Sequence, residues 1–302
     1  MSPIDPRTAY AGVPSLGTAQ AATDLAHHLG EGPTWDPVRE RLLWVDIMDG
    51  IVHEGRLTAD GRIDHVESFP FPDTAGAVAV AEDGAMVVAG THRLHYRDAD
   101  GRIESGRELF GGEDRRFNDA KPDPAGRLVG GTKGPGGEML LRIDEDERTT
   151  VIDDDLEMSN GLAWSRDGRR LYSIDTPTRR IFVRDYDAAT GETGPRSVFI
   201  ELEHGHPDGM TIDAEEHVWV AVFGGGCILR IAPDARIVAR VEVPAPNTTC
   251  PAFAGPGLDT LVITTATEGM DADRLAEFPL AGRLFTIRPG VRGMPPNLWA
   301  GR

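Results

Sequence analysis

Four polar side chains stand at equivalent places in a repeat that runs through the chain. Most repeats begin with a polar residue, continue through a short apolar run and a polar turn, and end in a second apolar run, as residues 207–221 do. The polar residues that begin these repeats are Glu31, Asn118, Asn160 and Asp208. Asp, Asn and Glu beside Gly commonly cap turns, but a shared position in the repeat favours one common site. Carboxylate and amide oxygens suit one divalent metal ion, Ca²⁺, Mg²⁺ or Mn²⁺, with Zn²⁺ or Fe²⁺ as alternatives.

The elements that position these residues are predicted to be short strands. Apolar runs of about four residues, partly β-branched and bounded by Gly, Asp or Pro, are typical of strands. The repeats begin at positions 31, 75, 118, 160, 208 and about 250, a spacing typical of four-stranded propeller blades. Helical patterns, which a solenoid of this period would need, are absent. We therefore predict an all-β fold, a six-bladed β-propeller with four-stranded antiparallel blades, in which the polar residues meet at a central channel.

The domain organisation follows from the same reading. Residues 1–20 are rich in Pro, Gly and Ala without a sustained period, so we expect a loosely attached N-terminal arm. Residues 21–302 are predicted to form a single propeller domain. The two cysteines, Cys227 and Cys250, lack the spacing of metal-binding pairs and are expected to be buried small apolar side chains.

Charge and hydropathy exclude several classes of partner. The chain has a formal net charge of -18 and no basic stripe, which makes nucleic acid and anionic membranes poor partners. No apolar run is long enough to span a bilayer, and the first 30 residues lack the pattern of a signal peptide. We expect a cytoplasmic protein that acts on a small molecule, and the oligomeric state stays open.

Several longer motifs resemble the regucalcin/gluconolactonase/luciferin-regenerating enzyme family. They are residues 29–33 (LGEGP), 116–119 (RFND), 159–165 (SNGLAWS) and 207–210 (PDGM). The resemblance spans nearly the whole chain. It implies a six-bladed propeller with one divalent metal ion held by Glu31, Asn160 and Asp208, and it places Arg116 and Asn118 where substrate is contacted.

The residue types fit hydrolysis of a sugar lactone to the corresponding aldonic acid. A lactone is an activated ester, so its hydrolysis needs a polarised carbonyl, a nucleophilic water and a place for negative charge. Asp208 is the candidate catalytic residue, either as ligand and general base together or as ligand alone. Two alternatives stay open. One is an esterase or organophosphate hydrolase on the same scaffold, and the other is a metal-binding regulatory protein without enzymatic activity, which the presence of Arg116 and Asn118 disfavours.

One loop departs from the family pattern. Residues 133–138 (KGPGGE) form a short, glycine-rich segment where many members carry a longer loop with an acidic residue facing the substrate. This difference puts that acidic contact in doubt. We expect the charges of Lys133 and Glu138 to be solvated, with a contribution to substrate preference as the alternative.

Overall fold

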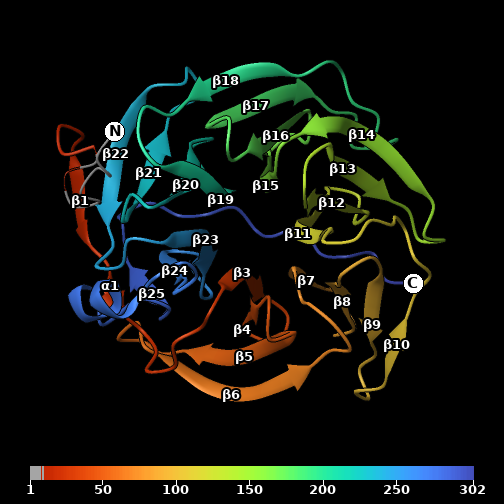
Figure 1. Cartoon of the computed structure of the whole chain (residues 1–302), viewed down its shortest axis with the longest axis horizontal. Coiled ribbons are helices and arrows are strands. Elements are labelled where there is room, and N and C mark those ends of the chain that lie inside the picture. Colours follow the sequence, from red (N-terminus) through yellow and green to blue (C-terminus); the bar gives the residue numbers. More distant parts are fainter. Residues whose placement is uncertain (1–7, 9) are drawn as a thin grey trace.

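The protein consists of six β-sheets arranged around one central axis, shown in the computed structural model of Figure 1. The structure describes residue 8 and residues 10–302. In most sheets the strands follow one another along the chain from the inside outward, each antiparallel to the last, before the chain moves to the next sheet. The prediction of an all-β, six-bladed propeller with four-stranded antiparallel blades is confirmed.

The first three blades are formed by residues 30–156. Blade 1 contains β3 (Gly30–Asp36), β4 (Arg41–Asp46), β5 (Ile51–Leu57) and β6 (Ile63–Pro70). Blade 2 contains β7 (Ala77–Val80), β8 (Met86–Ala89), β9 (Leu94–Arg97) and β10 (Ile103–Ser105). Blade 3 contains β11 (Arg116–Pro122), β12 (Leu128–Lys133), β13 (Glu138–Ile143) and β14 (Thr149–Leu156).

The last three blades draw on both ends of the chain. Blade 4 contains β15 (Ser159–Trp164), β16 (Arg170–Asp175), β17 (Arg180–Asp185) and β18 (Ser197–Glu201). Blade 5 contains β19 (His206–Ile212), β20 (Val218–Phe223), β21 (Cys227–Ile231) and β22 (Ile237–Glu242), with β1 (Ser15–Thr18) added parallel to β22. Blade 6 contains β23 (Thr248–Ala254), β24 (Thr260–Thr265), β25 (Phe285–Ile287) and β2 (Gln20–Ala21).

The N-terminal segment closes the ring. Strand β2 pairs with β25 through Gln20 opposite Thr286, so the outermost strand of the last blade comes from the start of the chain. The prediction of a loosely attached arm over residues 1–20 is therefore wrong from Ser15 onward, because these residues satisfy the open edges of β22 and β25. Residues 1–7 and 9 of that predicted arm lie outside the described residues.

The core lies between neighbouring blades. The innermost strands contact one another in the order β3, β7, β11, β15, β19, β23 and back to β3. Apolar side chains from facing sheets fill the space between them, among them the fully buried Trp44 and Trp219. Cys227 and Cys250 are also buried and free, as expected. This packing holds the inner ends of six strands at fixed positions around the axis.

The C-terminal segment crosses the end of the channel where the inner strands finish. Gly293 bridges to Asp213 after β19, Asn297 Nδ2 donates to Pro122 O at the end of β11, and Trp299 bridges to Ala81 after β7. The opposite end, where the inner strands begin, is the end at which Glu31, Asn118, Asn160 and Asp208 lie. Helix α1 (Ala272–Glu277) is short, and among the described residues no helix has the length and hydropathy needed to cross a membrane.

Candidate metal centre

The polar residues that begin the repeats lie at irregularities of the inner strands. The regular pairing of each strand with its neighbour is interrupted between Phe117 and Asp119 in β11 and between Asn160 and Leu162 in β15. The corresponding strands β3, β19 and β23 are interrupted at Glu31, at Pro207 and at Thr248. Such bulges re-aim side chains. They explain how residues from separate blades can point into one channel.

Three predicted metal ligands line one cavity. The cavity has a volume of about 240 Å³, and its walls include Glu31, Asn160 and Asp208 together with Asn118. All four side chains are buried. Gly161 allows the ligands of two blades to approach, because a Cβ at this position would lie 2.5 Å from the backbone oxygen of Asp208. The structure thus brings together the residues that the sequence analysis named as a metal site.

The two carboxylates have perturbed acidity. Burial, followed by the negative charge of Asp208, raises the pKa of Glu31 well above its ordinary value. Burial and the charge of Asp119 likewise raise the pKa of Asp208, while a hydrogen bond with the Asn160 side chain opposes the shift. Neither carboxylate forms an ion pair with a described Lys or Arg. Two buried carboxylates in this state are unfavourable together unless a cation lies between them.

Asp119 is a third buried carboxylate that the sequence analysis did not select. Its charge raises the pKa of both Glu31 and Asp208, and burial raises the pKa of Asp119 itself against the positive charge of Lys121. Its Oδ2 has no hydrogen-bond partner within the part of the chain that the structure describes. Asp119 directly follows Asn118, at the irregularity of β11 between Phe117 and Asp119. This position beside a predicted site residue is the signal that could have identified it.

Thr176 orients the amide of Asn160, one of the predicted metal ligands. Asn160 Nδ2 donates a hydrogen bond to Thr176 Oγ1 at 3.2 Å, and that hydroxyl donates to Pro207 O at 2.8 Å. Asn160 Oδ1 accepts only a long hydrogen bond of 3.2 Å from Gly161 N. Its oxygen can therefore face a cation. Thr176 lies in the loop after β16, outside the repeat pattern, so no motif indicated this role.

Arg116 and Asn118 are joined to each other. Arg116 Nη1 donates to Asn118 Oδ1 at 3.0 Å and to Phe117 O at 2.8 Å, while Asn118 Nδ2 donates to Ser159 O at 3.0 Å. Burial lowers the pKa of Arg116, and the carboxylates of Glu268 and the metal site oppose this shift. The predicted substrate-contacting pair is thus part of the same electrostatic environment as the predicted metal ligands.

The short loop after β12 differs from expectation. Glu138 is fully buried, where it accepts hydrogen bonds from Thr132 Oγ1 at 2.7 Å and Arg115 Nε at 3.1 Å. The expectation that its charge is solvated is wrong, because the buried carboxylate is held by hydrogen bonds from Thr132 and Arg115. Lys133 instead lines the cavity, and its Nζ lies 3.8 Å from Glu268 Oε1. His206 also lines the cavity, at its exposed edge.

The donor set fits a hard divalent cation. Glu31 Oε2 accepts a hydrogen bond from Gly32 N at 2.7 Å, and for Oε1 no protein donor is found among the described residues. With Asp208 and Asn160 Oδ1, this oxygen completes a set of two carboxylates and one amide, which is the chemistry of Ca²⁺ or Mg²⁺ sites. The described residues contain no cluster of three or more His, Cys, Asp or Glu suited to a metal ion. The amide of Asn160 is therefore an essential member of the proposed set.

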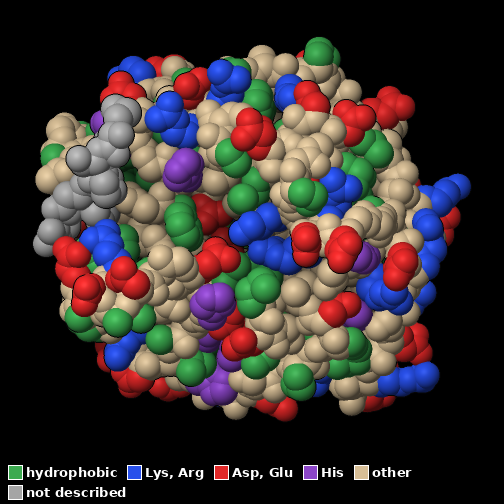
Figure 2. Space-filling view, in the orientation of Figure 1, with side chains coloured by type: hydrophobic (Ala, Val, Ile, Leu, Met, Phe, Trp, Pro, Cys, Tyr) green, Lys and Arg blue, Asp and Glu red, His purple; other side chains and the backbone are tan. Residues whose placement is uncertain are grey.

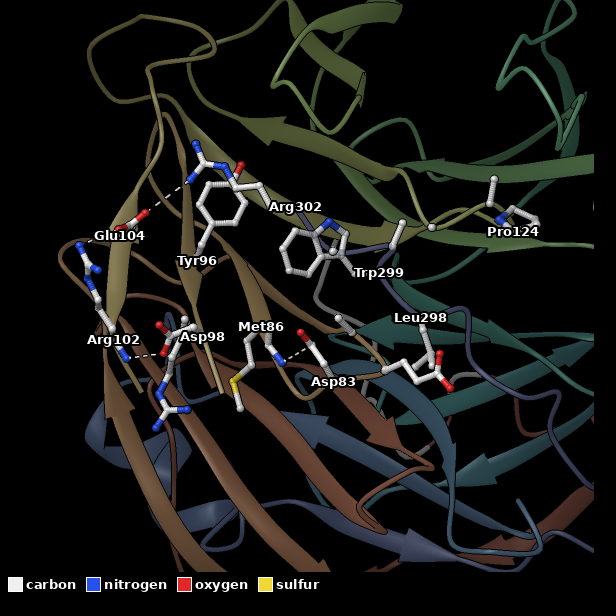
Figure 3. A pocket seen from close by; sticks show the side chains of 18 residues that line it. Asp83, Met86, Tyr96, Asp98, Arg102, Glu104, Pro124, Leu298, Trp299 and Arg302 are labelled. Carbon is white, nitrogen blue, oxygen red and sulfur yellow. Dashed lines mark hydrogen bonds and ion pairs between the residues drawn. The ribbon is translucent and has the colours of Figure 1, made fainter. Parts of the chain in front are cut away.

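A larger cavity lies away from the channel. It measures about 990 Å³ and lies between blade 2 and the C-terminal residues, where Tyr96 stacks against Trp299 and Arg302 lies over the Tyr96 ring (Figure 3). Figure 3 shows its charged side chains, such as Arg102 and Glu104, paired with each other. The acidic side chains that line this larger cavity are exposed, whereas the channel cavity is lined by the buried carboxylates of Glu31 and Asp208. The channel cavity is accordingly the stronger functional candidate.

Comparison with known proteins identifies relatives along nearly the whole chain. The chain is 35% identical to 6-deoxy-6-sulfogluconolactonase of Pseudomonas putida, over 90% of this chain and 95% of the relative. It is 38% identical to a putative sugar lactone lactonase of Bacillus subtilis, with the same shares covered. A crystal structure of the calcium-binding protein regucalcin from Agrobacterium tumefaciens superposes with a TM-score of 0.86, at 31% identity, over 95% of this chain and 99% of that chain. Residues 29–267 match the model of the SMP-30/Gluconolactonase/LRE-like region, and the chain therefore belongs to this family, as its motifs predicted.

Proposed function

We propose that the protein is a metal-dependent lactonase that opens a sugar lactone to the corresponding aldonic acid. The observation that carries this proposal is the convergence of Glu31, Asn160 and Asp208 in one cavity. Arg116 acts electrostatically on the same carboxylates. The printed names of two relatives, a sulfogluconolactonase and a putative sugar lactone lactonase, support lactone hydrolysis as the reaction.

Glu31, Asn160 and Asp208 would hold the divalent ion, whose identity we leave among Ca²⁺, Mg²⁺, Mn²⁺, Zn²⁺ and Fe²⁺. When bound, such an ion supplies a Lewis acid that polarises the lactone carbonyl and makes a neighbouring water more acidic. The calcium-binding description of the regucalcin structure supports a divalent ion here. The protein contributes a fixed geometry, since Thr176 and Gly32 hold two of the ligands by hydrogen bonds.

Asp208 is proposed to accept the proton of the attacking water. The water oxygen bonds to the carbonyl carbon, the bond from that carbon to the ring oxygen breaks, and the released oxygen takes up the proton held by Asp208 to become a hydroxyl. Burial raises the pKa of Asp208 in the protein without a cation. With a divalent ion bound, this increase would be offset, and Asp208 would be ionised and able to accept the proton.

Arg116 and Asn118 are proposed to position the sugar. One guanidinium nitrogen, Nη1, is occupied by Phe117 O and Asn118 Oδ1, and this leaves the other donors of Arg116 for the hydroxyls or ring oxygen of the substrate. Asn118 also bonds the backbone of Ser159 in the next blade. Its side chain therefore keeps the guanidinium in place across the boundary between two blades.

A lactone panel tests the proposal directly. Metal-stripped protein is reloaded with each divalent ion and assayed by proton release at fixed pH, with the spontaneous opening of each lactone subtracted. We expect at least one aldonolactone to open faster with one of the ions than with stripped protein. If no aldonolactone opens faster than in buffer while phosphotriesters or aryl esters are cleaved, an esterase or organophosphate hydrolase replaces this proposal.

A further inference from the structure

Arg116 is a nearly buried cation without an ion pair. Among the described residues two arginines are buried, Arg116 with 9% and Arg184 with 4% of its surface exposed. The guanidinium of Arg184 forms an ion pair with Asp153. Within the described chain, Arg116 makes hydrogen bonds only to the neutral oxygens of Phe117 and Asn118. A buried charge is unfavourable unless it is paired, and the carboxylates of Glu268, Glu31 and Asp208 act on Arg116 without forming a described ion pair with it. The guanidinium therefore favours an anion within ion-pair distance.

Lys133 brings a second cation to the channel cavity, whose wall includes Asn118, the hydrogen-bond partner of Arg116. Its Nζ lies 3.8 Å from Glu268 Oε1, and both side chains line the cavity with about a third of their surface exposed, 31% and 35%. Figure 2 shows basic side chains directly beside acidic ones at the hollow centre of this face. Among the carboxylates that act electrostatically on Arg116, Glu268 has the largest effect. An ion pair of this length and exposure is weak, so Lys133 can exchange Glu268 for a charged group of a ligand.

The charge balance of the cavity favours a negative ligand. Four carboxylates and three cations interact electrostatically in and around this cavity. The carboxylates are those of Glu31, Asp119, Asp208 and Glu268, and the cations are Arg116, Lys121 and Lys133. A divalent ion at the proposed metal site would leave one positive charge in excess. Because Lys121 compensates Asp119 and the ion would compensate Glu31 and Asp208, this excess falls to Arg116 and Lys133.

We propose that Lys133 and Arg116 together bind an anionic substituent of the substrate, a carboxylate or sulfonate remote from the ring carbonyl. The preferred substrate is then an acidic sugar lactone rather than a neutral one. This inference rests on the proposed lactonase function and specifies its substrate class. No bond of the substituent breaks, and Glu268 is displaced from Lys133 when the substituent binds.

Two lactones of the same ring size provide the test. D-Glucono-1,4-lactone and D-glucaro-1,4-lactone differ only at C6, where the second carries a carboxylate. We expect kcat/KM to be higher for the acidic lactone. Lys133→Met should lower the ratio of acidic to neutral kcat/KM about tenfold, which is the scale of one hydrogen bond to a charged group. Glu268→Gln should raise the ratio, because Lys133 then loses its competing partner.

The matched control is an exposed cation outside the channel. Arg288 follows β25 and donates to Ala59 O, so Arg288→Gln changes the net charge by the same amount and should leave the ratio unchanged. Thermal unfolding of each variant verifies that it is folded. A ratio that stays constant in both Lys133→Met and Glu268→Gln, with the neutral lactone hydrolysed well, overturns the inference and leaves the lactonase function intact.

Binding of the reaction products gives a readout that needs no turnover. Titration calorimetry on metal-loaded protein should give a lower Kd for glucarate than for gluconate, and Lys133→Met should remove most of that difference. Higher ionic strength should reduce it as well, since the lysine is partly exposed. Equal Kd values for the two products in the wild-type protein contradict the inference. Failure to open any aldonolactone faster than buffer, by contrast, contradicts the proposed function.

Discussion

Thr176 Oγ1 accepts a hydrogen bond from Asn160 Nδ2 at 3.2 Å and so determines which end of the Asn160 amide is free to face the cavity. The proton of the Thr176 hydroxyl is already donated to Pro207 O at 2.8 Å. The hydroxyl can therefore only accept from Asn160, which requires the amide nitrogen on that side. One side chain thus connects the amide ligand in blade 4 to the residue before Asp208 in blade 5.

The first prediction concerns this orienting bond. Thr176→Val keeps the size of the side chain but removes the hydroxyl, so Asn160 can rotate and the metal affinity should fall about 10- to 100-fold, as is typical for residues that orient metal ligands. Competition with a metal-sensitive dye measures this affinity. Thr178→Val is the control, because the Thr178 hydroxyl bonds only Asp175 O. Equal metal affinities of Thr176→Val and the wild-type protein would show that the bond has no such role.

The second prediction is that Asp208→Asn has opposite effects on the stability of the metal-free protein and on metal binding and activity. Burial and the charge of Asp119 raise the pKa of Asp208, which means that the ionised form is unfavourable in the folded protein without a cation. Asp208→Asn should therefore raise the Tm of metal-free protein at neutral pH. The same change should lower metal content, measured by elemental analysis, and lower kcat strongly. A lower Tm of the metal-free variant than of the metal-free wild-type protein would contradict the inference that ionised Asp208 destabilises the fold when no cation is bound.

The third prediction concerns the link between Arg116 and Asn118. Arg116→Ala should mainly raise KM, if the contact with substrate is equally strong in the ground state and in the transition state. Asn118→Ala should have a smaller effect of the same kind, because it loosens the guanidinium rather than removing it. Steady-state kinetics of both single variants and the double variant form a double-mutant cycle. Additive effects would indicate that the two residues act independently, whereas coupled residues give non-additive changes.

Repetition explains how much of this molecule the sequence could predict. Each blade carries its own turn and strand signals, so the blade number and the candidate residues Glu31, Asn118, Asn160 and Asp208 follow from local patterns. Their convergence needs no knowledge of loops, because equivalent positions of a propeller meet at one axis. The resemblance to the family then selected Glu31, Asn160 and Asp208 as the predicted metal ligands, and Arg116 and Asn118 as the predicted substrate contacts.

What sequence reading missed depends on contacts between distant segments. Residues 15–21 have little strand character of their own, and their pairing with β22 and β25 is imposed by the open edges of those strands, more than 200 residues away. Glu138 is in a glycine-rich loop that looks solvent-exposed, yet Arg115 and Thr132 hold its carboxylate inside. Thr176 has no motif at all, and only the fold brings it beside Asn160.

The fourth prediction concerns stability at mildly acidic pH. His53, on β5, is buried with its ring stacked on Trp44, at a centroid distance of 5.4 Å, and 4.7 Å from the ring of His27. Its Nδ1 bonds Ser68 Oγ at 2.9 Å, while its Nε2 has no partner among the described residues. Burial, followed by the positive charges of His27 and His65 when these are protonated, lowers the pKa of His53 from 6.5 to about 4, against the opposing charge of Asp46 on β4.

The sign of the pH effect follows from this shift. An unfolded chain binds a proton at His53 near its ordinary pKa of 6.5, whereas the folded protein resists protonation until about 4. Protonation therefore favours unfolding progressively as the pH falls through this interval, and above it His53 makes no contribution. His53→Gln removes the titrating group. The loss of Tm between about pH 7.5 and about pH 5 should be smaller in this variant than in the wild-type protein. His28→Gln, a change at an exposed histidine, should reproduce the wild-type loss, and a His53→Gln protein that did the same would rule out His53 as the source of the acid sensitivity.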